Sequence, residues 1–157
     1  MATTILGIDP GREKCGVAVV AVDPGSRRKM GQGPVITSAA AMSQYGLTLL
    51  HHDVVSADLM LKAIASLVLR FDVSNLVLGN QTTSAAWHAK LKDTVKIPIS
   101  LIDERNSTLE ARDRYWMMYP ASGLSRWVPQ ALRTIPGPVD GIVAILLVER
   151  YLAQQDG

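Results

Sequence analysis

The chain begins with two short runs of β-branched and apolar residues that are separated only by a tight turn. The run Thr3–Asp9 ends at Pro10-Gly11, and the run Cys15–Val22 ends at Asp23-Pro24. Apolar runs bounded by turn residues are typical of strands, so the two segments are expected to pair antiparallel through the loop 10–14. This hairpin restricts the chain to folds that open with antiparallel strands.

The rest of the chain alternates between helix and strand patterns. A third strand is expected within 35–55, and Ser56 offers an N-cap for an amphipathic helix through Leu59, Ala63, Leu67 and Phe71. Further strands are expected at 75–79 and 98–103, and helices at 83–92, 108–119 and 139–153. Ser107 and Glu110 have capping-box spacing at the second of these helices. The pattern predicts an α/β fold with a mixed five-stranded sheet flanked by helices, in a single domain covering 1–157.

The composition is that of a globular chain. Its 157 residues are 48% hydrophobic and 19% charged, which excludes a disordered or fibrous protein. The net charge is only +2, so a polyanionic partner would have to be held by a local patch. Cys15 is the single cysteine and is expected to be a buried spectator in a reduced, cytoplasmic compartment. The most apolar run, 141–148, is too short to span a bilayer.

Three acidic residues occupy unusual places at the ends of apolar elements. Asp9 closes the first strand, Glu104 follows the strand at 98–103, and Asp140 opens the most apolar helix. Carboxylates rarely lie beside such cores unless they are paired or bound to a metal. If the two strands were adjacent, their ends and the start of the helix would converge on one point.

Converging carboxylates would repel one another, by about 4 kcal/mol per close pair at an effective dielectric constant of about 20. Protonation or divalent cations would relieve this repulsion, and ligand sets made only of oxygen favour Mg²⁺ or Mn²⁺. Two such ions would activate water and stabilise the leaving oxygen in phosphodiester hydrolysis. Each acid also has a simpler interpretation: Asp9 as a turn residue, Asp140 as a helix N-cap acid, and Glu104 as a surface partner of Arg105.

The same acids lie within three longer motifs. These are ILGIDPGREKCGVAV at 5–19, DERNST followed by Glu110-Ala-Arg112 at 103–112, and the Asp-led apolar helix at 139–152. Together, and in this order, they resemble the YqgF/RuvX family, a branch of the RuvC-like nucleases with an RNase H fold. One departure is the segment Gly79-Asn80-Gln81, which lacks the proline usual in that family's Gly-x-Pro.

The resemblance implies an RNase H-like domain and a metal-dependent nuclease, with Asp9, Glu104 and Asp140 as its catalytic and metal-binding acids. It implies two Mg²⁺ (or Mn²⁺) ions, which Asp9 would bridge. The family is associated with maturation of the 16S rRNA precursor and was proposed to resolve Holliday junctions, so either nucleic acid is an expected substrate. A junction resolvase would require a symmetric homodimer, whereas a single-site RNA processor need not dimerise.

Basic and aromatic residues follow Glu104 in the sequence. Between 105 and 133 five arginines, Arg114 and Arg133 among them, outnumber two acids, and Trp116 and Trp127 lie between the arginines. Phosphates attract Arg and Lys, and unstacked bases stack on aromatic rings. Trp116 could instead belong to the core, and Arg112 could pair with Glu110 or Asp113. The expected nucleic-acid contacts are Arg12, Lys14, Asn80, Arg105, Arg112, Arg126 and Trp127.

Two other functions are compatible with these residues. One is a catalytically inactive RNase H-fold module that binds nucleic acid without metal-dependent cleavage. The other is an actin-like phosphotransferase, because Asp9-x-Gly11 followed by Gly16 is similar to that group's phosphate loop. Such enzymes need two lobes of this kind to enclose a nucleotide, and a chain of 157 residues is expected to form only one.

Overall fold

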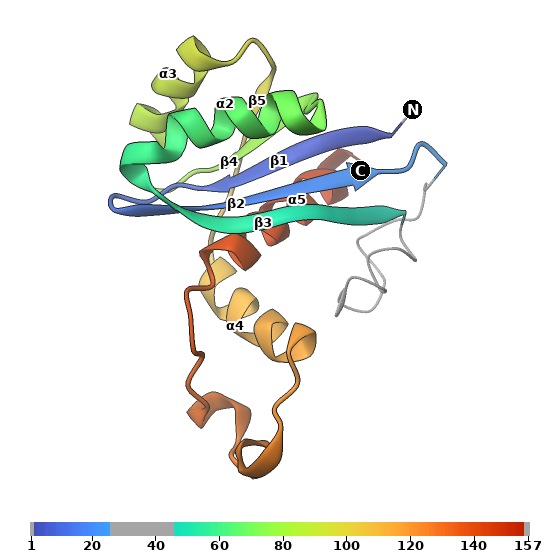
Figure 1. Ribbon diagram of the computed structural model, residues 1–157, viewed down its shortest axis with the longest axis vertical. Coiled ribbons are helices and arrows are strands. Elements are labelled where there is room, and N and C mark those ends of the chain that lie inside the picture. The colour runs from blue at the N-terminus through green and yellow to red at the C-terminus, as the bar shows by residue number, and fades with distance from the viewer. Residues whose placement is uncertain (1, 26–45, 156–157) are drawn as a thin grey trace.

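The structure is a computed structural model that describes residues 2–25 and 46–155. They form a five-stranded sheet in the order β3-β2-β1-β4-β5 (Figure 1). The strands are β1 (Thr3–Asp9), β2 (Lys14–Val22), β3 (Leu47–Ser56), β4 (Asn75–Gly79) and β5 (Ile99–Ile102). The first three pair antiparallel, whereas β4 is parallel to β1 and β5 is parallel to β4. The predicted mixed five-stranded sheet is confirmed.

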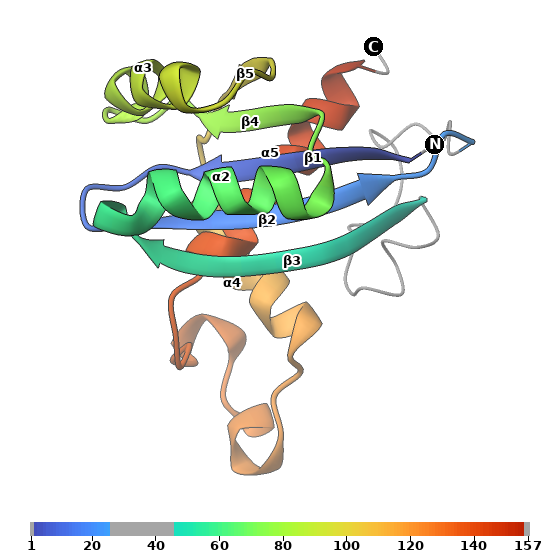
Figure 2. The ribbon, with the colours of Figure 1, turned by 45° about the horizontal axis from the view of Figure 1, so that its top comes forward.

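Helices cover both faces of this sheet, as Figures 1 and 2 show. They are α2 (Met60–Phe71), α3 (Ser84–Thr94), α4 (Ser107–Met118) and α5 (Asp140–Gln155). Alternate residues of a strand point to opposite faces. Leu6 and Ile8 of β1 therefore pack with α2 and α3, whereas Ile5 packs with α5. The α4 helix lies against α5 on this second face.

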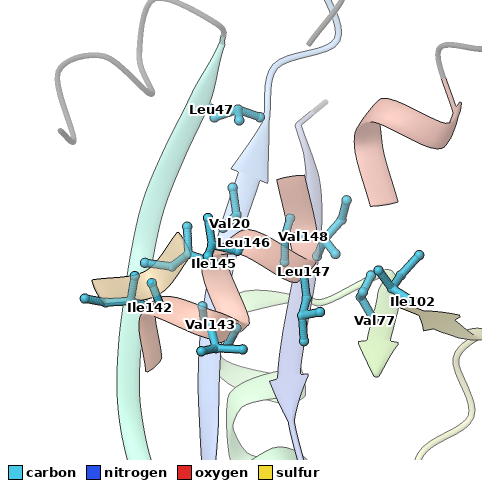
Figure 3. Close-up of a cluster of buried hydrophobic side chains, with 14 residues drawn as sticks. Val20, Leu47, Val77, Ile102, Ile142, Val143, Ile145, Leu146, Leu147 and Val148 are labelled. Carbon is cyan, nitrogen blue, oxygen red and sulfur yellow. The ribbon is translucent and has the colours of Figure 1, made fainter. Parts of the chain in front are cut away.

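The most apolar helix lies directly on the sheet. Every residue of α5 from Gly141 to Val148 is buried. Figure 3 shows Val143 and Leu147 of this helix among side chains of the strands, including Val20 and Val77. A helix segment that is apolar on all sides must be covered on all sides, and α4 supplies the second cover.

The start of α2 differs from the prediction. Ser56 ends β3 and precedes a 3₁₀ turn, η1 (Ala57–Leu59), without a side-chain capping bond. The α-helix begins only at Met60, and its buried face includes Met60 and Leu67, while Leu59 is exposed. The predicted N-cap and the inclusion of Leu59 in the apolar stripe are therefore wrong. The 3₁₀ turn has a different residue period, which moves the stripe out of phase.

The capping box predicted at α4 is also wrong. Asn106 precedes the helix in the left-handed conformation (φ 60°), and Ser107 is a buried residue within its first turn. The Ser107 backbone N–H donates to the Glu104 carbonyl (3.0 Å), so the turn after Glu104 sets the start of the helix. Glu110 is paired with Arg150 instead of the helix N-terminus (3.0 Å).

The bounds of β1 and β4 are those predicted, and the other element boundaries differ from the predicted ones by at most two residues. The third strand, β3, ends one residue beyond the window 35–55, and positions 35–45 of that window lie outside the described residues. Within residues 2–25 and 46–155, no helix is long and apolar enough to cross a membrane.

Between α4 and α5 the chain forms an arm, residues 119–139, that projects away from the sheet (Figures 1 and 2). It contains two 3₁₀ turns, η2 (Gly123–Trp127) and η3 (Gln130–Leu132). Gln130 Nε2 donates to Asp113 Oδ1 of α4 (2.9 Å), which attaches the arm to the helix before it.

Candidate active site

The three acids meet at one edge of the sheet, although the strands of two of them are not neighbours. Asp9 is the last residue of β1 and Glu104 follows β5, with β4 between these strands. The strand adjacency considered from the sequence is therefore wrong. The convergence still occurs, because β1, β4 and β5 run parallel and end at the same edge.

Gly79, the last residue of β4, provides the space through which Glu104 reaches Asp9. A Cβ atom at position 79 would overlap the carboxyl group of Glu104. Glycine in a strand often marks a place where another group approaches the backbone closely. Here the approaching group is the Glu104 carboxyl, which passes over the end of β4.

Two further glycines bring the start of α5 to the same edge. A Cβ atom at Gly16 of β2 would overlap the Asp140 carbonyl, and one at Gly7 of β1 would overlap the Ala144 carbonyl. The backbone of α5 therefore lies directly on β1 and β2. Asp140, the first residue of the helix, is close enough to raise the pKa of Asp9 by charge repulsion. Its Oδ2 forms an ion pair with Lys14 Nζ (3.4 Å).

Asp9 and Glu104 form a buried carboxyl pair, 7% and 6% exposed. Burial raises the pKa of Asp9 from 3.8 to about 6, and Asp140 adds to this rise, while a hydrogen bond with Glu104 opposes it. Burial likewise raises the pKa of Glu104 from 4.5 to about 8, and the neighbouring Asp9 adds to it. In the metal-free chain the pair therefore holds about one proton near pH 7.

The turn that carries Glu104 is held from two sides. The Glu104 backbone N–H donates to Asn80 Oδ1 (3.3 Å) at the end of β4. From α5, Arg150 donates through Nη1 to the Asp103 carbonyl (2.6 Å) and through Nη2 to the Arg105 carbonyl (2.9 Å). Arg150 therefore contacts the backbone on both sides of Glu104.

Arg150 was not predictable as part of this site. Its two carbonyl partners lie 47 and 45 residues away in the sequence. The one local signal is its place just beyond the apolar run of α5, after Glu149, where a charged side chain reaches the end of a buried surface. Asn80 is exposed and its Oδ1 accepts from the Glu104 N–H, while its expected contact with nucleic acid stays a prediction.

The turn between β1 and β2 brings Arg12 and Lys14 to the acids. The Gly11 carbonyl accepts a hydrogen bond from Trp87 Nε1 (3.2 Å), and the Gly11 N–H donates to Cys15 Sγ (3.4 Å). Cys15 is buried, as predicted, and helps to shape this turn. A depression of about 310 Å³ results, lined by residues that include Asp9, Arg12, Lys14, Gln81, Thr108 and Asp140.

Arg105 and Arg114 have partners that the sequence did not indicate. Arg105 Nε pairs with Asp103 Oδ2 (2.9 Å), so the interpretation of Glu104 as the surface partner of Arg105 is wrong. Arg114 is buried and forms a two-pronged pair with Glu149 of α5 (2.8 and 2.9 Å). Its inclusion in a basic surface is therefore wrong, because a side chain between two packed helices cannot meet a phosphate.

The remaining nucleic-acid candidates are exposed. Arg112 on α4 forms no ion pair among the described residues, because Glu110 and Asp113 bond to other side chains. Arg126 and Trp127 lie on η2 of the arm, and Trp127 is 80% exposed. Trp116 is half-buried on α4, with the Arg133 guanidinium 5.4 Å from its ring centre.

In the part of the chain that the structure describes, no cluster of three or more carboxylate, imidazole or thiol side chains is arranged to bind a metal ion. Asp140 is paired with Lys14, which leaves Asp9 and Glu104 as a pair. Both carboxyl oxygens of Glu104 are buried, and apart from the Asp9 carboxyl, with which Glu104 shares a hydrogen bond, no group of the described residues donates to them. Buried carboxylate oxygens without other donors are suited to bind a cation, because hard divalent ions such as Mg²⁺ take oxygen ligands.

No protein-family model matches the chain. In sequence it is 28% identical over 98 residues, 60% of its length, to a Psychrobacter protein named "Putative pre-16S rRNA nuclease". The chain spans about half the length of this curated relative, since the match covers 49% of it.

Solved structures resemble the chain over nearly its whole length. Thermus thermophilus RuvC superposes with a TM-score of 0.58 and 16% identity, covering 98% of this chain and 95% of RuvC. The RuvC complex with a Holliday junction substrate gives 0.53 and 16%, over 98% and 94% of the two chains. Fowlpox virus resolvase with Holliday junction DNA gives 0.53 and 10%, over 96% and 99%. The chain therefore has the RNase H-like fold of the RuvC resolvases, and the resemblance to the YqgF/RuvX family indicated by its three motifs is confirmed.

Proposed function

We propose that this chain is a metal-dependent nuclease that hydrolyses phosphodiester bonds. The observation that carries the proposal is the buried Asp9–Glu104 pair, in which Glu104 has no partner but Asp9, beside a depression that Asp9 itself lines together with Arg12 and Lys14. The buried carboxylates need a positive counterion, which a metal ion would supply, and the basic side chains would attract a phosphate of the substrate. The RuvC-like fold and the name of the curated relative support the same activity.

Two metal ions, Mg²⁺ or Mn²⁺, would be held by Asp9, Glu104 and Asp140. Oxygen-only donors match these hard cations, and the buried oxygens of Glu104 fit them. Asp140 would exchange its ion pair with Lys14 for the metal. The bound ions supply activation of water and stabilisation of the departing oxygen.

The chain's own residues prepare the site for this chemistry. Glu104 must lose the proton that burial keeps on it, which couples metal binding to proton release. Once Asp140 binds the metal, the Lys14 ammonium group would no longer be paired with it. Lys14 could then pair with a phosphate of the substrate. Arg12, exposed on the same turn, adds a second positive charge at the opening of the depression.

Gly79→Ala is expected to displace Glu104 without unfolding the chain, because the new Cβ overlaps a flexible side chain. We expect the affinity for Mn²⁺, measured by titration calorimetry, to fall by about 10- to 100-fold. Gly137→Ala is the matched control, since a Cβ at Gly137 meets no atom within 4 Å. Equal Mn²⁺ affinity in the two variants would contradict the role of Gly79.

Arg150→Met is expected to loosen the turn that carries Glu104. It removes donors to the Asp103 and Arg105 carbonyls, so the free energy of unfolding should fall by about 1–3 kcal/mol. Mn²⁺ affinity should fall by about 10-fold or more, because the ligand is no longer held in place. Urea denaturation and calorimetry measure both quantities. Arg70→Met, at the exposed end of α2, is the control, and unaltered Mn²⁺ binding in Arg150→Met would refute the effect.

The substrates proposed are a 16S rRNA precursor or a four-way DNA junction. The first follows from the name of the curated relative, and the second from the structures of resolvases with junction DNA. A homodimer is proposed only with the junction, because two symmetric cuts need two sites.

The test is cleavage of an end-labelled 16S rRNA precursor and of a four-way DNA junction, each with Mg²⁺, Mn²⁺ or EDTA. We expect cutting that requires metal, and the substrate that is cut identifies the biological role. Binding of both substrates without any cleavage would overturn the proposal and indicate a catalytically inactive module.

A further inference from the structure

The depression at the acids continues into a second one at the base of the arm. This second depression, about 650 Å³, is lined by Arg112, by Arg133 and by other residues of 131–139. It shares Lys14, Thr108 and Asp140 with the first. The two depressions therefore adjoin at these residues and are together called the groove, which extends from Asp9, past the N-terminal half of α4, to the arm.

This groove is basic beyond the acids. Lys14, Arg112 and Arg133 line its second part, where Asp140 is the one acidic residue and is already paired with Lys14. The sequence from 114 to 139 contains no Asp or Glu. Positive charge along a groove that lacks acids attracts the phosphates of a polyanion.

The arm presents exposed apolar side chains on a segment whose backbone is hydrogen-bonded to Arg133. Leu124 is 87% exposed and Trp127 is 80% exposed, next to Arg126. Arg133 holds the segment that carries them, since its Nε donates to the Val128 carbonyl (2.8 Å) and its guanidinium lies over Trp116. A held, exposed indole beside arginines offers a face on which a base can stack.

We infer that the groove and arm form a binding site for an unpaired nucleic-acid strand, with phosphates at Lys14, Arg112 and Arg133 and a base stacked on Trp127. The inference deepens the proposed nuclease function and rests on it. The strand must be unpaired because bases inside a duplex are stacked on each other, so their faces are not available to Trp127.

The test uses the full chain carrying Asp9→Asn, so that binding is measured without cleavage. Fluorescence anisotropy compares labelled oligo(U) and oligo(dT) of about 20 nucleotides with blunt duplexes of the same length. Adding Trp127→Ala should weaken single-strand binding about 10-fold and leave duplex binding unchanged, while Trp127→Phe should stay within about 3-fold of the parent. Leu69→Ala, exposed on α2, is the control for removing an apolar side chain.

Arg112→Ala should lower the slope of log affinity against log salt for single strands by about 0.7, and Lys62→Ala on α2 should not. Unchanged single-strand binding in Trp127→Ala would overturn the inference, as would an equal loss for the duplex. Light scattering measures the oligomeric state. A dimer that becomes monomeric in Trp127→Ala would also overturn the inference, because the arm would then contact a second copy of the chain. Metal-dependent cleavage without Trp127-dependent binding overturns only this inference, whereas Trp127-dependent binding without cleavage overturns only the proposed nuclease.

Discussion

Asp9→Asn should reduce metal-dependent cleavage by at least about 10³-fold while leaving the fold intact. Asp9 lies between Glu104 and Asp140 and interacts with both, so its carboxylate is the one that the whole site shares. The amide has nearly the same shape but no negative charge, and it cannot neutralise a divalent ion. Initial rates on whichever substrate is cut, at saturating Mg²⁺ or Mn²⁺, measure the loss.

The same variant has a second expected result that separates catalysis from folding. In EDTA at pH 7, Asp9→Asn should raise the free energy of unfolding by about 1–3 kcal/mol, because it removes a buried charge beside two other acids. Asp93→Asn, at the exposed end of α3, is the matched control and should alter neither cleavage nor stability. A destabilised Asp9→Asn protein would show that Asp9 has a structural role instead.

The metal-free protein should lose stability as the pH rises from 5 to 9. Burial raises the folded-state pKa of Glu104 to about 8 from 4.5, and that of Asp9 to about 6 from 3.8. The folded state thus binds these protons more tightly than the unfolded state does. Their contribution is complete below the unfolded pKa values and is lost as the pH passes through about 6 and then about 8. The expected loss is a few kcal/mol, measured by urea denaturation in EDTA.

Glu104→Gln should remove most of this pH dependence, because glutamine carries no titrating proton. Asp58→Asn, on the exposed η1 turn, should keep the slope of the parent protein. Added Mg²⁺ or Mn²⁺ should restore stability more at pH 8 than at pH 6, since the ion competes with the Glu104 proton. A flat curve for the parent protein, or a slope that survives in Glu104→Gln, would contradict the buried carboxyl pair.

Local patterns in the sequence were enough to predict four of the five strands, the apolar closing helix and the places of the three acids at the ends of elements, whereas the third strand could be assigned only to a window. Asp9, Glu104 and Asp140 are each visible because an acid interrupts an apolar pattern where a strand or helix ends. The N-terminal hairpin was also predictable from a local pattern, because Pro10-Gly11 separates two β-branched runs. The helix starts at Ser56 and Ser107 were not, because a 3₁₀ turn and a left-handed Asn106 leave no comparable local signal.

Contacts between distant elements were decided only by the tertiary structure. Because β4 lies between β1 and β5, Glu104 reaches Asp9 through the space that Gly79 leaves free. The packing of α5 brings Arg150 to the turn that carries Glu104. The same packing buried Arg114 against Glu149. Local periodicity indicates which face of an element is apolar, but it contains no record of which element covers that face. Partners 35 to 47 residues apart are therefore set by how the helices lie on the sheet.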